Sequence, residues 1–86
     1  MLLKSKQLIG LEVKTKNGQR LGRLVDLEME TETSEVKKYI VGADSWIKNK
    51  IIPELVIDSS QIIEITDQSI IVDDSLLNQA ALSQIA

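Results

Sequence analysis

The sequence predicts an all-β fold, a small antiparallel β-barrel of about six strands with a short C-terminal helical tail. Three observations predict it. Apolar and polar residues alternate in several short segments, turn signals separate these segments, and Ile, Leu and Val dominate the apolar residues. Such side chains suit a pleated surface. The 86 residues leave room for one domain, expected at residues 1–74, and for the tail at residues 75–86.

The first hairpin is expected around Asn17-Gly18. Residues 8–15 alternate loosely before this pair, and residues 20–30 follow it. Both Asn and Gly tolerate positive φ, which a type I′ turn requires, so the pair is a strong signal for a tight hairpin.

Residues 20–30 form the clearest predicted strand. Val25, Leu27 and Met29 alternate with acidic residues, so they are expected to face the core while the acids face water. Gly22 stands just before a slip in this alternation. A bulge or bend at Gly22 is therefore expected, because it would re-aim the strand as a closing barrel requires.

The remaining apolar segments are interpreted as strands at residues 36–43, 55–57, 61–66 and 69–73. Residues 55–57 are also compatible with a single turn. Pro53 has no N–H to donate and belongs at a sheet edge or a strand start. The last two segments form a second hairpin around Asp67-Gln68. The residues of this hairpin that are expected to alternate into the core are Ile63, Ile65, Ile70 and Val72.

The tail is interpreted as a short amphipathic helix or a frayed end. Asp73, Asp74 and Ser75 are residue types that favour a helix start. A helix of about 11 residues is not stable alone, so an ordered tail would pack on the barrel or on another subunit. Four apolar residues at helical spacing are the first candidates for a subunit or partner contact, namely Leu76, Leu77, Ala81 and Ile85.

Trp46 is the only Trp of the chain and lies in a polar segment, expected to be a loop, near Lys48, Asn49 and Lys50. An aromatic residue beside cations is a good anchor for a protein interface. Alternatively, Trp46 folds back and fills the mouth of a barrel that lacks Phe. Both readings stay open, and Trp46 is the second candidate for a partner contact.

The composition excludes several kinds of chemistry. There is no Cys and no His, which removes disulfides, thiol catalysis and His-based triads or metal sites. No Gly-rich phosphate loop or nucleophile elbow is present, so no enzyme activity and no cofactor are expected. Apolar runs are too short to span a membrane, and the first residues do not resemble a signal peptide. A cytoplasmic location is the simplest expectation.

The charged residues are unevenly distributed along a chain of net charge −3. The acidic row is Asp26, Glu28, Glu30 and Glu32. Its members alternate along one strand, about 7 Å apart, so a solvated face is favoured over a metal site. The basic residues near the start are Lys4, Lys6, Lys14, Lys16, Arg20 and Arg23. No aromatic residues are interleaved with them, so solvated strand faces are favoured over an RNA-binding patch.

Opposite charges at the two ends of the chain have two interpretations. They predict either cross-strand pairs within one sheet or a bipolar surface that docks on itself or on a partner. The second interpretation, the small core and the apolar tail together favour a homo-oligomer, with a dimer first.

Three segments resemble the PRC-barrel family, named after the photosynthetic reaction-centre H subunit and found also in the C-terminal domain of the ribosome-maturation factor RimM. Residues 5–13 are similar to its opening strand, and residues 17–27 (NGQRLGRLVDL) to its most recognisable hairpin. Residues 51–56 and 61–65 are similar to its closing segments. One departure is the turn Thr33-Ser34-Glu35, where the family often has Gly.

The resemblance implies binding rather than catalysis, because members of the family serve as docking surfaces and share no catalytic motif. It implies a self-associating adaptor that docks on a larger assembly, such as the cell-division machinery. The alternative that it implies is a factor of ribosome maturation or RNA processing. Protein partners are thus expected, and nucleic acid is possible but not favoured.

Overall fold

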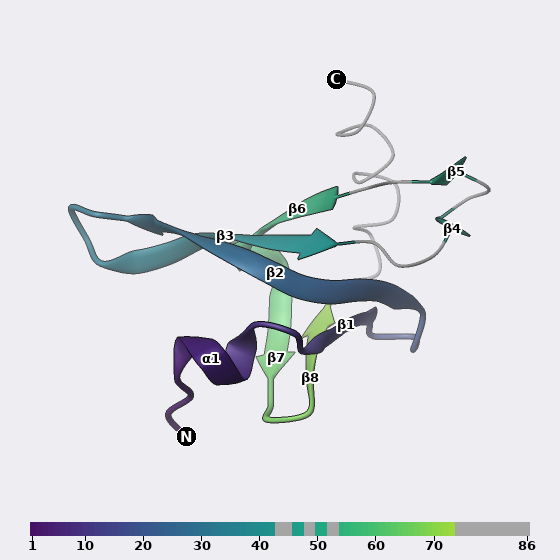
Figure 1. The fold of residues 1–86 in the computed structure, drawn as a ribbon, viewed down its shortest axis with the longest axis horizontal. Coiled ribbons are helices and arrows are strands. Elements are labelled where there is room, and N and C mark those ends of the chain that lie inside the picture. The colour runs from purple at the N-terminus through teal and green to yellow at the C-terminus, as the bar shows by residue number, and fades with distance from the viewer. Residues whose placement is uncertain (43–45, 48–49, 52–53, 74–86) are drawn as a thin grey trace.

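A computed structural model describes residues 1–42, 46–47, 50–51 and 54–73 (Figure 1). In chain order its elements are α1 (Ser5–Leu8), β1 (Glu12–Thr15), β2 (Arg20–Glu30), β3 (Glu35–Gly42), β4 (Trp46–Ile47), β5 (Lys50–Ile51), β6 (Glu54–Asp58), the 3-10 helix η1 (Ser59–Gln61), β7 (Ile62–Ile65) and β8 (Ser69–Val72). The all-β prediction is confirmed. The predicted helical tail lies outside the described residues.

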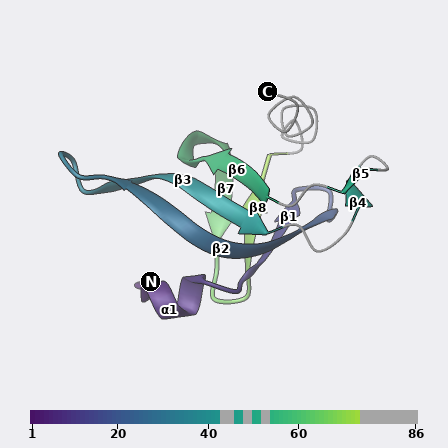
Figure 2. The ribbon, with the colours of Figure 1, turned by 45° about the horizontal axis from the view of Figure 1, so that its top comes forward.

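Six strands form one sheet in the order β6-β3-β2-β1-β8-β7, and β4 pairs with β5 in a small sheet of its own. Neighbouring strands are antiparallel except β1 and β8, which are parallel. Figures 1 and 2 show that β7 and β8 run across the direction of β3 and β6. The sheet is therefore strongly bent, and its two halves face each other.

The predicted closure of the barrel is wrong, because the sheet is open and ends at β6 and β7. The cause lies in the link between these two strands. They are joined by the single turn of η1, where the Asp58 carboxylate accepts a hydrogen bond from the backbone N–H of Ser60 at 2.9 Å. This turn changes the direction of the chain, so β7 runs across β6 instead of pairing with it.

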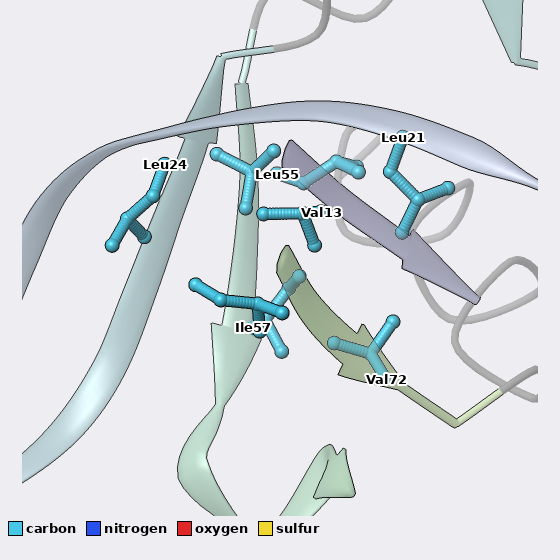
Figure 3. Packing of buried hydrophobic residues seen from close by; sticks show 8 residues of the cluster. Val13, Leu21, Leu24, Leu55, Ile57 and Val72 are labelled. Carbon is cyan, nitrogen blue, oxygen red and sulfur yellow. The ribbon is translucent and has the colours of Figure 1, made fainter. Parts of the chain in front are cut away.

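The core lies between the two halves of the bent sheet (Figure 3). Its fully buried apolar residues are Val13, Leu21, Leu24, Val41, Leu55, Ile57, Ile70 and Val72. All eight are Val, Leu or Ile, as expected from a composition without Phe. Burial of such side chains from five strands, β1, β2, β3, β6 and β8, is the main stabilising contribution to the fold.

The bulge expected at Gly22 is confirmed. Val13 pairs with Gly22 but Lys14 pairs with Arg20, so β2 has one extra residue, Leu21, at this point. Leu21 and Gly22 are consequently both buried although they are neighbours. A bulge of this kind increases local twist and bends the strand, which here lets β2 belong to both halves of the sheet.

The predicted core face of β2 is wrong for two of its three residues. A second bulge makes Val25 the extra residue between Leu24 and Asp26, so Leu24 takes the core position and Val25 is 47% exposed. Met29 is exposed because the β2–β3 hairpin extends beyond the other strands (Figure 1). Leu27 packs against the core as expected.

The second hairpin likewise shows one correction. Ile70 and Val72 are in the core, and Ile65 packs against it. Ile63, however, is exposed, because a register shift between Ile62 and Glu64 makes it the extra residue of β7. Residues 55–57, for which a turn was the alternative, lie within strand β6.

The start of the chain also differs from the expected strand over residues 8–15. Residues Ser5–Leu8 form one helical turn, and β1 begins only at Glu12. The Gln7 side chain accepts a hydrogen bond from the Lys4 N–H at 2.8 Å, and Leu8 packs against the core. Local capping and this apolar anchor together favour the helical turn over an extended segment.

The hairpin between β1 and β2 is confirmed, but its turn is not type I′. Gly18 is the turn residue with positive φ, at 91°. Its N–H donates to the Thr15 carbonyl at 2.8 Å, and the Thr15 N–H donates to the Gln19 carbonyl at 2.8 Å. This is the pattern of a three-residue loop with glycine at the bulge position.

Candidate docking face

The sheet face that points away from the core carries apolar side chains over β3 and β6. Leu55 and Ile57 are buried on β6, so the residue between them, Val56, points to the opposite side and is 47% exposed. Ile40 lies directly opposite Val56 in the register, and directly opposed residues of antiparallel strands share a face. We call this side of β2, β3 and β6 the outer face.

Val25 extends the apolar surface onto β2. A Cβ atom built on Gly42 would lie 3.0 Å from Val25 Cγ1, so the Val25 side chain occupies the space above Gly42. Gly42 and Ile40 are two residues apart on β3 and therefore face the same side. Val25, Ile40 and Val56 together form what we call the outer patch.

Charged residues surround the outer patch. The strand register places six of them on this face, namely Arg23, Asp26, Glu28, Lys38, Glu54 and Asp58. Four are acidic and two are basic, so the rim carries a negative balance. An apolar centre with a charged rim is the usual anatomy of a protein interface.

One corner of this rim is held by hydrogen bonds around Asp58. The Ser60 hydroxyl donates to Asp58 Oδ2 at 2.6 Å, and Lys38 Nζ donates to Oδ1 at 2.9 Å. These two contacts, with the Ser60 N–H, hold the pKa of the Asp58 carboxyl far below its ordinary value. The carboxylate thus stays ionised, and the contact neutralises the Lys38 charge next to the patch.

Along the chain, Trp46 lies between Gly42 and Glu54, which are at one end of the outer face. Gly42 and Glu54 are opposite each other in the register, and β4 and β5 are inserted between them, with Trp46 paired to Ile51. Figures 1 and 2 show this hairpin beyond the ends of β3 and β6. The structure describes the backbone at Trp46 only, so the choice between plug and anchor stays a prediction. The four tail candidates, Leu76, Leu77, Ala81 and Ile85, lie outside the described residues.

The basic residues of the first hairpin are partly engaged within the fold. Glu12 carboxylate oxygens lie 4.0 Å from Lys14 Nζ and 3.6 Å from Arg20 Nε. Arg23 donates through Nη1 to the Gly10 carbonyl at 3.0 Å. These contacts reduce the positive charge that this hairpin offers to a phosphate backbone.

The acidic row is exposed along β2 and the turn after it. Two of its members bind backbone groups: the Leu27 N–H donates to Asp26 at 2.8 Å and the Glu32 N–H to Glu30 at 3.2 Å. Within the described ranges, no three acidic, His or Cys residues come together as a metal ion would require.

Sequence reasoning missed the outer patch. For Val56 a signal existed, because it stands between two apolar residues in a short strand and must then point away from the side that they share. For Val25 the signal was hidden, because its orientation depends on the bulge beside it. Ile40 was within a predicted strand, but its face depends on the register with β6.

These features define a class of protein, a small bent-sheet domain with an apolar core and a rimmed apolar outer face. The sequence model of the PRC-barrel domain matches residues 2–78. The chain therefore belongs to the PRC-barrel family. No curated protein matches the chain. In the part of the chain that the structure describes, no helix is long and apolar enough to cross a membrane.

Proposed function

We propose that this chain is a non-enzymatic protein-binding module of the PRC-barrel type, which self-associates and docks on a larger assembly. The observation that carries the proposal is the outer patch: two valines that are each 47% exposed on either side of Ile40, within a charged rim. Removing exposed aliphatic side chains of a sheet face from water lowers the free energy of the complex with a partner.

The surroundings of the patch support binding over catalysis. The Lys38–Asp58 pair and the η1 hydrogen bonds fix the corner of the face, and a pre-organised surface loses less conformational entropy on association. Asp58 has a lowered pKa, which suits a permanently charged rim residue; a general acid–base group needs a pKa near the working pH.

Sedimentation velocity of three chains tests the proposal. We expect the wild-type chain to associate as its concentration rises, and Val56→Lys to remain monomeric at the same concentrations. Ile63→Lys is the matched control, because Ile63 is also a β-branched residue of an edge strand, 53% exposed on β7. It should associate like the wild type. Equal behaviour of the two variants would contradict the assignment of the outer patch.

Docking on a larger assembly is tested by affinity capture from a lysate of the source organism, with the wild type and both lysine variants. A partner lost with Val56→Lys, kept with Ile63→Lys and insensitive to nuclease supports the adaptor. A partner that is lost on nuclease treatment, with binding that falls steeply with salt, favours the ribosome- or RNA-associated alternative. An assembly such as the cell-division machinery and a cytoplasmic location stay predictions.

A further inference from the structure

We propose that the outer patch of one copy of this chain binds the N-terminal segment, residues 1–6, of a second copy. This inference rests on the proposed docking role of the outer face and names its occupant. It follows from two unusual surfaces that have complementary chemistry.

The N-terminal segment is apolar at its start and basic after it. Met1 is 84% exposed and Leu2 is 98% exposed. Lys4 and Lys6 follow and are exposed, and no acidic residue precedes Glu12. The segment thus presents two large apolar side chains beside two cations.

The outer face offers the matching groups. Val25, Ile40 and Val56 are its apolar centre, and four of the six charged residues around them are acidic. Lys38 is held by Asp58 at 2.9 Å, so it is already paired. Asp26 and Glu28 lie on β2 at the side of the patch, where a lysine of an incoming segment would find two carboxylates. Opposite charge around an apolar contact selects both the partner and its orientation.

The segment is anchored on the side of the sheet away from the outer patch of its own copy. Leu8 fixes α1 on the core side of the sheet, whereas the patch is on the opposite side. Val56 on β6 is two strands beyond β2 in the sheet order, about 10 Å at the usual strand spacing. The segment of a second copy is not held by this anchor and can approach the patch from outside.

Charge reversal on each side tests the contact by sedimentation equilibrium. Lys4→Glu with Lys6→Glu should raise the dissociation constant about tenfold, because two ion pairs at a partly exposed rim are replaced by like charges. Asp26→Lys with Glu28→Lys should have an effect of similar size. All four changes in one chain should bring the constant back to within about threefold of wild type. Lys16→Glu, on the loop of the first hairpin, should change it less than twofold.

The four substituted residues are exposed, so each variant is expected to melt cooperatively like the wild type. Three results would overturn the inference. The first is loss of association in Val56→Lys with no effect of the Lys4 and Lys6 reversal, which leaves the outer face as a docking surface with another occupant. The second is failure of the fourfold variant to recover. The third is a wild-type chain that stays monomeric at every concentration, and the capture experiment above then decides the proposed function separately.

Discussion

Lys38 and Asp58 are directly opposite each other on β3 and β6, and Lys38 Nζ lies 2.9 Å from Asp58 Oδ1. The same carboxylate accepts hydrogen bonds from the hydroxyl and the N–H of Ser60. One side chain thereby joins two strands and the η1 turn at the corner where the sheet changes direction. Asp58 is a structural support for the outer face rather than a reactive group.

The first prediction concerns pH. The pKa of Asp58 is lowered in the folded state, chiefly by the Ser60 hydroxyl and by Lys38, while in the unfolded chain it is about 3.9. Its contribution to stability is therefore complete at pH 6 and is lost progressively as pH falls below about 4. We expect Asp58→Asn to have a lower melting temperature than the wild type at pH 6. This difference in melting temperature should become smaller as pH approaches 2. A gap that is the same at both pH values would contradict this role.

The second prediction concerns two turn residues with left-handed backbone. Gly18 has φ of 91° with open space around its Cα, so Gly18→Ala should cost about 1 kcal/mol of unfolding free energy through backbone strain alone. Ser34 has φ of 64° in the turn where the family often has Gly. Ser34→Gly should therefore be neutral or stabilising, by up to about 1 kcal/mol. Urea unfolding measures both, and a stabilising Gly18→Ala would contradict the assigned backbone.

The third prediction concerns the core. Leu24 and Ile57 are fully buried and come from different strands of the bent sheet. Ile57→Val should lower the free energy of unfolding by about 1 kcal/mol, and Leu24→Ala should lower it by about 2–5 kcal/mol. For a domain of this size the larger loss is a considerable fraction of the total stability. Val25→Ala is the control, because Val25 is the exposed neighbour of Leu24 on β2. In chemical denaturation it should lower the free energy of unfolding clearly less than Leu24→Ala.

The fourth prediction concerns Trp46. If Trp46 is an interface anchor, Trp46→Ala weakens partner binding and leaves the melting transition cooperative. We expect this outcome on the basis of the hairpin's place beyond β3 and β6 (Figure 1). Loss of cooperative melting in the variant would favour the plug of the barrel mouth instead. Circular dichroism melting and a binding titration on the same sample separate the two.

The fifth prediction concerns the tail. Light scattering of a chain truncated after Asp74 shows whether Leu76, Leu77, Ala81 and Ile85 contribute to the oligomer. If association depends on residues 1–6 and the outer patch, the truncated chain keeps the wild-type mass. A monomeric truncated chain would instead support the tail as the subunit contact.

The sequence predicted those features of the fold that depend on local chemistry. Asn17-Gly18 identified the first hairpin, Gly22 identified the bulge, and alternation placed Ile70 and Val72 in the core. The all-β class followed from the excess of branched apolar residues, and the PRC-barrel family from the order of three short segments.

The features that escaped prediction depend on contacts between distant strands. A single extra residue at Val25 puts Leu24 instead of Val25 into the core, and the position of this bulge depends on the pairing with β3. The parallel pairing of β1 with β8 and the open edges at β6 and β7 likewise arise from tertiary arrangement. The outer patch could not be recognised for the same reason, because its three residues meet only through the register of β2, β3 and β6.

Methyl NMR of the wild-type chain over a concentration series tests the role of the outer face most directly. The methyl signals of Val25, Ile40 and Val56 should shift or broaden as the protein associates, together with those of Leu2. The signals of the exposed Ile63 should stay unchanged, because β7 is at the opposite end of the sheet order from β6. Changes at Ile63 with an unperturbed outer patch would contradict the account.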